Sequence, residues 1–115
     1  DDNLMLDSKE SLIENANRMR AIYGHRVEVI FGDSHNPAIV DYVRRFGPFD
    51  FGFIDGDHSY IGVKADWENY GPMCKTIAFH DIMGPCKEFW QEIKQDRNVV
   101  EFCDSKWLGI GIVFN

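Results

Sequence analysis

Ionisable side chains gather at three points of the sequence, and each point directly follows a short apolar run. The three groups are, in chain order, Gly32-Asp33-Ser34-His35, Asp55-Gly56-Asp57-His58 and His80-Asp81. Carboxylate oxygens together with one imidazole suit a hard divalent ion such as Mg²⁺ or Mn²⁺. His80 is also a candidate general base, because imidazoles titrate near neutral pH. The residue types therefore predict a site for metal binding or proton transfer.

Strand and helix patterns alternate along the chain and would position these groups. Apolar runs predict strands at residues 3–6, 26–31, 50–54, 76–79, 99–103 and 108–114. Apolar residues at helical spacing predict helices over residues 8–23, 37–46, 60–70 and 85–95. Gly24 is placed to end the first helix, and Asn36-Pro37 to begin the second. The alternation is typical of an α/β protein with a Rossmann-like, doubly wound and mostly parallel sheet.

A sheet of this kind would bring the charged groups together. Parallel strands end at one edge of the sheet, and ligands of open α/β sheets bind just beyond those carboxyl ends. The strand ends expected at that edge carry Asp7, Asp33-Ser34, Asp55-Gly56-Asp57-His58 and His80-Asp81. The nearly continuous apolar run at residues 49–54 predicts a central strand that is buried on both faces. A structural alternative is that Asp55 and Asp57 only cap the following helix.

The last two strands and the composition set further limits. Residues 99–103 and 108–114 are too close for a parallel crossover, so they predict an antiparallel hairpin. The 115 residues suffice for one domain over residues 1–115, and the net charge of −7 argues against a nucleic-acid partner. No long apolar run or signal-peptide pattern occurs, which predicts a soluble, cytoplasmic protein without membrane contact. Cys74, Cys86 and Cys103 form no C-x-x-C pair and are expected to be reduced core thiols.

Two motifs within this pattern resemble a known enzyme family. FIDGDHSYIGVKAD at residues 53–66 and IAFHDI at residues 77–82 are similar to the second half of class I S-adenosylmethionine-dependent methyltransferases. Small-molecule O-methyltransferases with I-D-G-D-H-x-Y and F-H-D motifs are the group that they resemble. The likeness runs from about Asn3 to Phe114, and the flanking helices are generic. It implies methylation of a hydroxyl group on a small molecule of the sugar or natural-product type, with assistance from Mg²⁺ or Mn²⁺.

The resemblance also implies a role for each matching residue. The implied residues are Asp7, Asp33, Ser34 and Asp55 for the cofactor, Asp55, His80 and Asp81 for the metal, and Asp55, His58 and His80 for catalysis. Asp7 would hold the ribose hydroxyls of S-adenosylmethionine, and Asp33 with Ser34 would lie beside its adenine. Tyr60 would line the pocket near the reacting methyl group. His25 and His35 match no motif and are expected to be ordinary loop or surface histidines.

The sequence departs from the family pattern before Asp7. Members of the family begin with a strand and a Gly-rich turn that holds the methionine part of the cofactor, and no such segment is present here. The usual Gly-Gly before the fifth strand is replaced by Cys74-Lys75. We therefore expect an N-terminally truncated form whose sheet lacks its first strand. The unpaired edges of such a sheet favour a homo-oligomer.

Two other functions remain open on the sequence alone. Asp and His at strand ends can also hold the paired ions of a two-metal phosphoesterase, about 4 Å apart, although the opening Asp-x-His is absent. A truncated domain could instead be a non-catalytic remnant or a partner-binding domain. Titration with S-adenosylhomocysteine, with and without Mg²⁺, would separate these functions from methyl transfer.

Overall fold

The computed structural model describes the backbone of every residue except 1, 105 and 107, and side chains from residue 10 onward apart from those at 105 and 107. It contains two compact units, Asp1–Phe31 and Gly32–Asn115, which are described in turn. The single domain expected over both units stays a prediction. Among the described residues, none of the helices has the length and apolar character needed to span a membrane.

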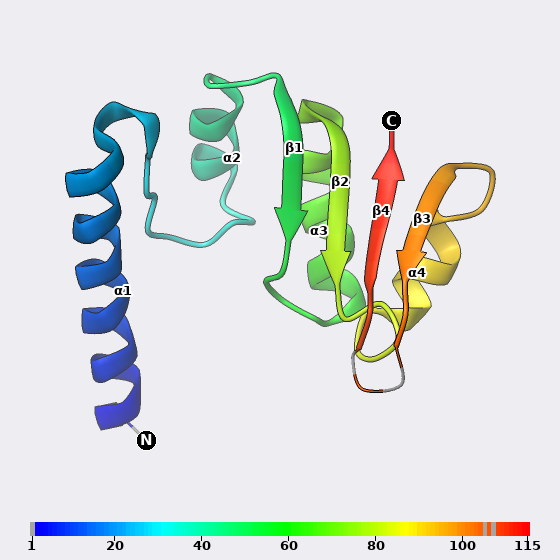
Figure 1. Ribbon diagram of the computed structural model, residues 1–115, viewed down its shortest axis with the longest axis horizontal. Coiled ribbons are helices and arrows are strands. Elements are labelled where there is room, and N and C mark those ends of the chain that lie inside the picture. Colours follow the sequence, from blue (N-terminus) through cyan, green and yellow to red (C-terminus); the bar gives the residue numbers. More distant parts are fainter. Residues whose placement is uncertain (1, 105, 107) are drawn as a thin grey trace. The chain divides into compact units, whose positions relative to one another are not determined.

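The first unit is built on one long helix, α1 (Asp2–Tyr23), followed by the short 3-10 helix η1 (Gly24–Arg26) (Figure 1). Gly24 has a φ of +61°, so it ends the helix in the left-handed conformation that the sequence predicts. The strand expected at residues 3–6 is wrong, because α1 runs through this segment. Its Leu and Met residues are good helix formers, and it holds no β-branched residue that would favour a strand.

The strand expected at residues 26–31 is wrong as well. Residue 26 belongs to η1, and residues 27–31 have neither helical nor strand structure. A strand is stabilised by hydrogen bonds to a neighbouring strand, and the other elements of this unit are helical. The guanidinium of Arg20 instead donates a hydrogen bond of 3.1 Å to the carbonyl oxygen of Val29. The alternating apolar residues therefore indicate an extended segment here. A strand would also need a neighbouring strand to pair with, and the local pattern does not specify one.

The second unit alternates helices and strands as predicted. Its elements are α2 (Pro37–Arg44), β1 (Phe49–Ile54), α3 (Tyr60–Tyr70), η2 (Gly71–Met73), β2 (Cys74–His80), α4 (Lys87–Ile93), β3 (Asn98–Phe102) and β4 (Ile110–Phe114). The strand order is β1-β2-β4-β3, with β1 and β2 parallel and β4 antiparallel to both β2 and β3 (Figure 1). The α/β class, these four strands and the closing hairpin are confirmed. The sheet is small and mixed, and the larger Rossmann-like order stays a prediction.

The position of β1 differs from the prediction of a central strand. In the described sheet β1 lies at the edge, with β2 as its neighbour. Phe51 and Phe53 are 55% and 50% exposed, so β1 is not buried on both faces. The continuous apolar run was a sound indicator of a strand, but only the identity of the neighbouring elements decides how much of that strand is covered.

The core lies between one face of the sheet and the helices α3 and α4, which stand behind the sheet in Figure 1. Its buried members are Val63, Ile77, Phe79, Ile82, Cys86, Phe89, Trp90, Ile93 and Val113. The ring of Phe79 lies at its centre, with centroids 5.6 Å from Phe89 and 6.0 Å from Trp90. Cys86 is buried and Cys74 is half-buried, but Cys103 is exposed just beyond β3, so the expectation of a core thiol is wrong for Cys103.

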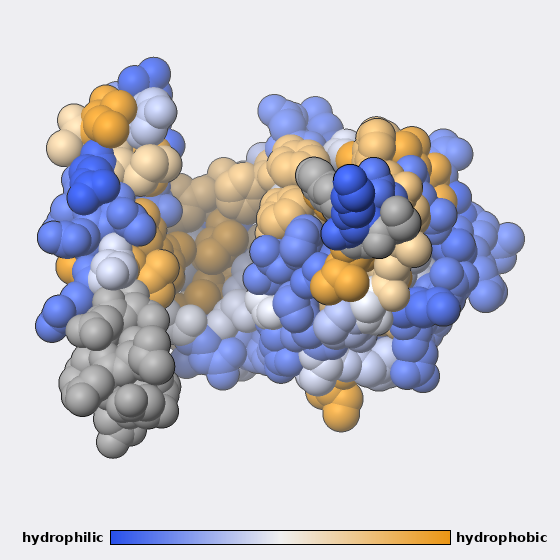
Figure 2. Space-filling model, turned by 60° about the horizontal axis from the view of Figure 1, so that its bottom comes forward, coloured by the Kyte–Doolittle hydropathy of each residue, from blue (hydrophilic) through white to orange (hydrophobic). Residues whose placement is uncertain are grey.

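The other face of the sheet is largely apolar and only partly covered. Side chains alternate between the faces of a strand, and the register places on this face Phe51, Phe53, Thr76, Ala78, His80, Asn98, Val100, Phe102, Ile110, Ile112 and Phe114. Phe102 and Phe114 are 59% and 46% exposed. Figure 2 shows hydrophobic residues reaching the surface of this unit in several places. His80 is the one titratable residue in this set of strand positions.

We expect Gly111→Ala to destabilise the second unit. A Cβ atom at Gly111 would lie 2.5 Å from Cζ2 of Trp90, whose ring is fully buried in the core. Overpacking of this kind costs about 1–3 kcal/mol, which urea unfolding can measure. Trp90→Phe removes the contacting ring atoms, so the double variant should lose less stability than the sum of the two single variants. Strict additivity would contradict this packing.

We also expect the chain to form a dimer through the largely apolar face of the sheet. This face is nearly free of charge although the chain carries a net charge of −7, so a second copy meets no repulsion there. Light scattering should give twice the monomer mass of 13.3 kDa. Val100→Lys should weaken association at least about tenfold, whereas Ile61→Lys, at an exposed position on α3, should not. A monomer at high protein concentration would contradict the expectation.

Candidate active site

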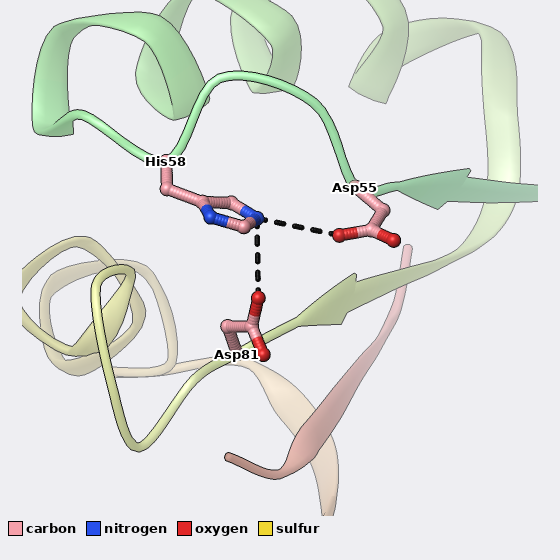
Figure 3. Close-up of side chains that lie close together, drawn as sticks. All are labelled: Asp55, His58 and Asp81. Atoms are coloured by element: carbon pink, nitrogen blue, oxygen red, sulfur yellow. Dashed lines mark hydrogen bonds and ion pairs between the residues drawn. The ribbon is translucent and has the colours of Figure 1, made fainter. Parts of the chain in front are cut away.

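The parallel pairing of β1 and β2 brings Asp55 to the same sheet edge as His80 and Asp81. Ile54, the last residue of β1, is the register partner of Phe79 in β2. The residues that follow this pair therefore emerge together, as the carboxyl ends of parallel strands do. Figure 3 shows Asp55 and Asp81 directed at the ring of His58, which lies on the loop between β1 and α3.

Four side chains form one cluster at this edge, which we call the Asp–His group: Asp55, His58, His80 and Asp81. Nε2 of His58 lies 3.3 Å from Oδ1 of Asp55 and 3.1 Å from Oδ2 of Asp81. Nδ1 of His80 lies 3.3 Å from Oδ1 of Asp55 and 3.0 Å from Oδ1 of Asp81. Each imidazole thus bridges both carboxylates, and the structure unites the residues that the sequence predicts for catalysis and for the metal.

Asp81 is the most deeply placed member of the Asp–His group. It is 5% exposed and has a φ of +63°, a left-handed conformation that Asp tolerates better than most residues. Its backbone N–H donates to the carbonyl oxygen of Gly109 (2.9 Å), and its own carbonyl oxygen accepts from Gly84 and Cys86. The backbone is therefore fixed at this point, and the carboxylate is held against the two imidazoles.

Nδ1 of His80 is a buried nitrogen without a hydrogen-bond partner among the described residues. Two carboxylate oxygens lie close enough for an ion pair, but their directions do not suit a hydrogen bond. A buried polar atom that is left unsatisfied is costly, and an ion or water at the site is a common explanation. This atom marks the point where the Asp–His group would accept a further ligand.

The donor set of the Asp–His group fits a divalent cation. Asp55, His58 and Asp81 each offer one ligand atom, and these atoms all lie within 4.8 Å of one another. Two carboxylate oxygens and an imidazole nitrogen suit Mn²⁺ in particular, and Mg²⁺ when water completes its shell. The sequence predicts Asp55, His80 and Asp81 as ligands, whereas the group of ligand atoms in the structure contains Asp55 and Asp81 with His58 in place of His80. The sequence signal for His58 was its position three residues after Asp55.

Asp57, by contrast, supports the turn before α3. Its Oδ1 accepts a hydrogen bond of 2.9 Å from the backbone N–H of Ser59, and Ser59 in turn caps α3 through Gly62. The backbone and side-chain hydrogen bonds from Ser59 lower the pKa of Asp57. A Cβ at position 62 would overlap the Asp57 carboxyl, so the glycine is needed for this approach. The N-cap of α3 is Ser59, so the structural alternative that Asp55 and Asp57 cap this helix is wrong, although Asp57 does have a structural role in the turn before it.

A second polar cluster joins the loop before α2 to α3. Ser34 Oγ donates a hydrogen bond of 2.9 Å to Oδ1 of Asp66, and Nε2 of His35 lies 3.2 Å from the same oxygen. The hydroxyl of Tyr70 donates to the carbonyl oxygen of Ser34 at 2.6 Å. Asp33 is exposed and accepts a hydrogen bond from the backbone N–H of His35. Ser34 therefore faces α3, whereas Asp33 shapes the turn.

Sequence reasoning missed Asp66 and undervalued His35. His35 lies on a loop as expected, but its ring is half-buried and tied to Asp66 and to the carbonyl oxygen of Gly62. A usable signal was present: Asp66 stands three residues after Val63 and four before Tyr70, on the helix face that otherwise turns inward. A carboxylate among core positions requires polar partners, which marks it for attention.

A cavity of about 470 Å³ connects the two clusters. Its polar lining comes from Ser34, Asp55, Asp66 and Tyr70, and most of its remaining wall is apolar and includes aromatic residues of β1. A concave, mostly apolar site with a few polar groups is typical of small-molecule binding sites, and this volume lies in their usual range. The cavity therefore offers a ligand access to both polar clusters.

Two other residues singled out in the sequence do not join this site. The ring of Tyr60 packs against Phe89, and its hydroxyl donates to Glu92 of α4, so the residue faces α4, and its place near the methyl group stays a prediction. The hydrogen bond to Glu92 raises the pKa of Tyr60. Asp7 lies within α1, and its side chain is outside the described residues, so its role stays a prediction.

A family model described as a methyltransferase domain matches residues 4–82, which is more than half of the chain. The match spans α1, the loop with Ser34, β1, α3, β2 and Asp81. No curated protein and no solved structure matches the chain.

We expect the Asp–His group to bind Mn²⁺. Calorimetric titration should show one site, because the group supplies two carboxylates and at least one imidazole at ligand distance. Asp55→Asn and Asp81→Asn should each weaken binding at least about tenfold, since each removes a charged ligand. Asp57→Asn is the matched control and should bind normally. Equal affinity in the Asp55 and control variants would contradict the assignment.

Proposed function

Because the chain belongs to the methyltransferase domain family, we propose that it transfers the methyl group of S-adenosylmethionine to a hydroxyl group of a small molecule. The observation that carries the proposal is the Asp–His group at the carboxyl edge of β1 and β2, with Asp55 in the wall of the cavity. His58 and His80 both lie 3.3 Å from the Asp55 carboxylate, which lines the cavity, so an imidazole is available nearby to remove a hydroxyl proton. S-adenosylmethionine is proposed as the methyl donor because the chain matches the methyltransferase family.

The cavity fits the adenosyl part of this donor. Its apolar wall can cover a purine ring, and its polar end offers oxygen atoms to the hydrogen-bond donors of a nucleoside. Ser34 and Asp55 contribute to this wall, which supports two of the four cofactor contacts proposed from sequence. Asp7 and Asp33 are the other two residues proposed to contact the cofactor, and they are proposed from the sequence alone.

The proposed reaction is a direct displacement. A lone pair of the acceptor oxygen forms the new O–C bond, and the electrons of the C–S bond remain on sulfur, which leaves S-adenosylhomocysteine. The hydroxyl proton passes to an imidazole of the Asp–His group, His58 or His80. The carboxylates of Asp55 and Asp81, at 3.0 to 3.3 Å, stabilise the imidazolium that forms.

A divalent cation, when bound, would act as a Lewis acid that lowers the pKa of the acceptor hydroxyl. Asp55, His58 and Asp81 are the residues that would hold it, and the unpartnered Nδ1 of His80 lies beside them. Carboxylates would orient the acceptor in either case, because a hydroxyl group can donate to them. The acceptor is proposed to be a small sugar-like or natural-product molecule, and its identity is set by surfaces beyond this group.

We expect the chain to release S-adenosylhomocysteine when it is given S-adenosylmethionine and a panel of phenols and simple sugars. EDTA should abolish release, and Mn²⁺ should restore it, because a cation held by Asp55, His58 and Asp81 would lower the pKa of the acceptor hydroxyl. Asp55→Asn should remain inactive in the presence of Mn²⁺. His58→Ala and His80→Ala should identify the base, whose loss costs about 10²–10⁴ in rate.

The controls distinguish the ways in which this expectation could fail. Asp57→Asn should retain full activity, since Asp57 supports only a turn. Full activity in EDTA together with loss in one histidine variant would remove the metal from the mechanism and keep the base. Activity that survives EDTA and both histidine substitutions would show that the Asp–His group is structural and would overturn the proposed chemistry.

A further inference from the structure

Two exposed apolar side chains, Met83 and Leu108, belong to the loops that hold Asp81 in place. Met83 is 48% exposed and Leu108 is 50% exposed, and neither belongs to the core. Met83 follows Asp81 by two residues on the loop after β2, and Leu108 lies on the segment before β4. Single exposed apolar residues are common on protein surfaces, so what matters here is how the two are held together.

Backbone hydrogen bonds join the two loops next to the site. The N–H of Asp81 donates to the carbonyl oxygen of Gly109 at 2.9 Å, and the N–H of Met83 donates to that of Leu108 at 2.7 Å. These bonds continue the antiparallel pairing of β2 with β4 beyond its last register pair, His80 with Ile110. The backbone of both apolar residues is therefore fixed relative to Asp81.

Each of the two side chains packs against a glycine of the opposite loop. A Cβ atom at Gly109 would lie 3.1 Å from Cγ of Met83, and one at Gly84 would lie 3.2 Å from Cδ2 of Leu108. Gly109 also has a φ of +84°, which favours glycine at this position. Both side chains are thus supported from one side and exposed on the other. Such a preformed apolar surface loses little conformational entropy when a ligand binds.

The neighbouring Asp–His group limits which ligands can use this surface. Its carboxylates, Asp55 and Asp81, disfavour an anionic molecule by repulsion between like charges. A sugar placed against Met83 and Leu108 would turn hydroxyl groups toward apolar atoms and lose their hydrogen bonds to water. An aryl or alkyl group would instead gain about two- to fourfold in affinity for each CH₂ group that it buries there.

We propose that Met83 and Leu108 form the apolar part of the acceptor site and select an uncharged hydroxyl compound with an aryl or alkyl body over a sugar. The inference rests on the proposed function, since it names the class of acceptor for the same site. The hydroxyl group of the acceptor faces the Asp–His group, and its apolar body lies on Met83 and Leu108. The flexible side chain of Met83 can adapt to apolar bodies of different shape.

The test compares phenol with 4-butylphenol, which share one hydroxyl group and differ in an alkyl chain, in the presence of S-adenosylmethionine and Mn²⁺. For the unmodified chain, kcat/KM should be at least about tenfold higher with 4-butylphenol, mainly through KM. Met83→Ser and Leu108→Ser should each reduce this preference to about threefold or less with little change in kcat for phenol, whereas Met83→Leu should keep it. Ile61→Ser, at an 80% exposed apolar position on α3, is the matched control and should keep the full preference.

A second measurement needs neither methyl transfer nor a variant with altered folding. In protein labelled with ¹³C at its methionine methyl groups, 4-butylphenol should shift the NMR signal of Met83, which its loss in Met83→Leu identifies, and glucose should not. If this shift occurs but neither phenol is methylated, the proposed function fails and the apolar binding site stands. If both phenols react equally well, if either serine variant keeps the full preference, or if the Met83 signal does not respond, the inference alone is overturned.

Discussion

A carboxylate that is buried away from water must be compensated by positive charge or by donated hydrogen bonds. The stability of the second unit depends on this compensation at Asp81, which is buried. Two histidines on different elements lie against it, His58 after β1 and His80 at the end of β2, at 3.1 and 3.0 Å. The parallel register of these strands is what makes both available. The contacts around this buried carboxylate thus place imidazoles and carboxylates together in an arrangement that acid–base chemistry can use.

The condition is met a second time at Asp66, with a different result. There the compensating groups are a hydroxyl and a ring on a loop that has little regular structure of its own. Tyr70 adds a third hydrogen bond to the same loop. Hydrogen bonds to α3 therefore hold this loop in place. Both polar ends of the cavity, at Asp66 and at the Asp–His group, contain a buried carboxylate that needs polar partners. The residues whose hydrogen bonds stabilise this part of the fold, Ser34, Asp66 and Tyr70, also line the cavity.

Much of the second unit could be predicted from local pattern. Asn36 caps α2, Ser59 precedes α3, and the bounds of α3 are those the apolar spacing predicts. The convergence of Asp55 with Asp81 followed from strand direction alone. The failures have a common cause: a strand needs a partner that the local pattern does not specify. The segments 3–6 and 26–31 form no strand, and β1 became an edge. Asp66 stands at an inward position of α3, which was a local signal, but its partner Ser34 lies 32 residues away and could not be identified from the local pattern.

The position of β4 has a consequence for how the protein comes into being. Strand β4 is inserted between β2 and β3, and its residue Val113 is fully buried. The amide of Asn115 then donates to the carbonyl oxygens of Gly71 and Cys74, where β2 begins. During synthesis β1 and β2 emerge long before the strand that joins them to β3. The nascent sheet therefore stays divided until β4 has been synthesised, and a chain without β4 would lack the interior of its own sheet.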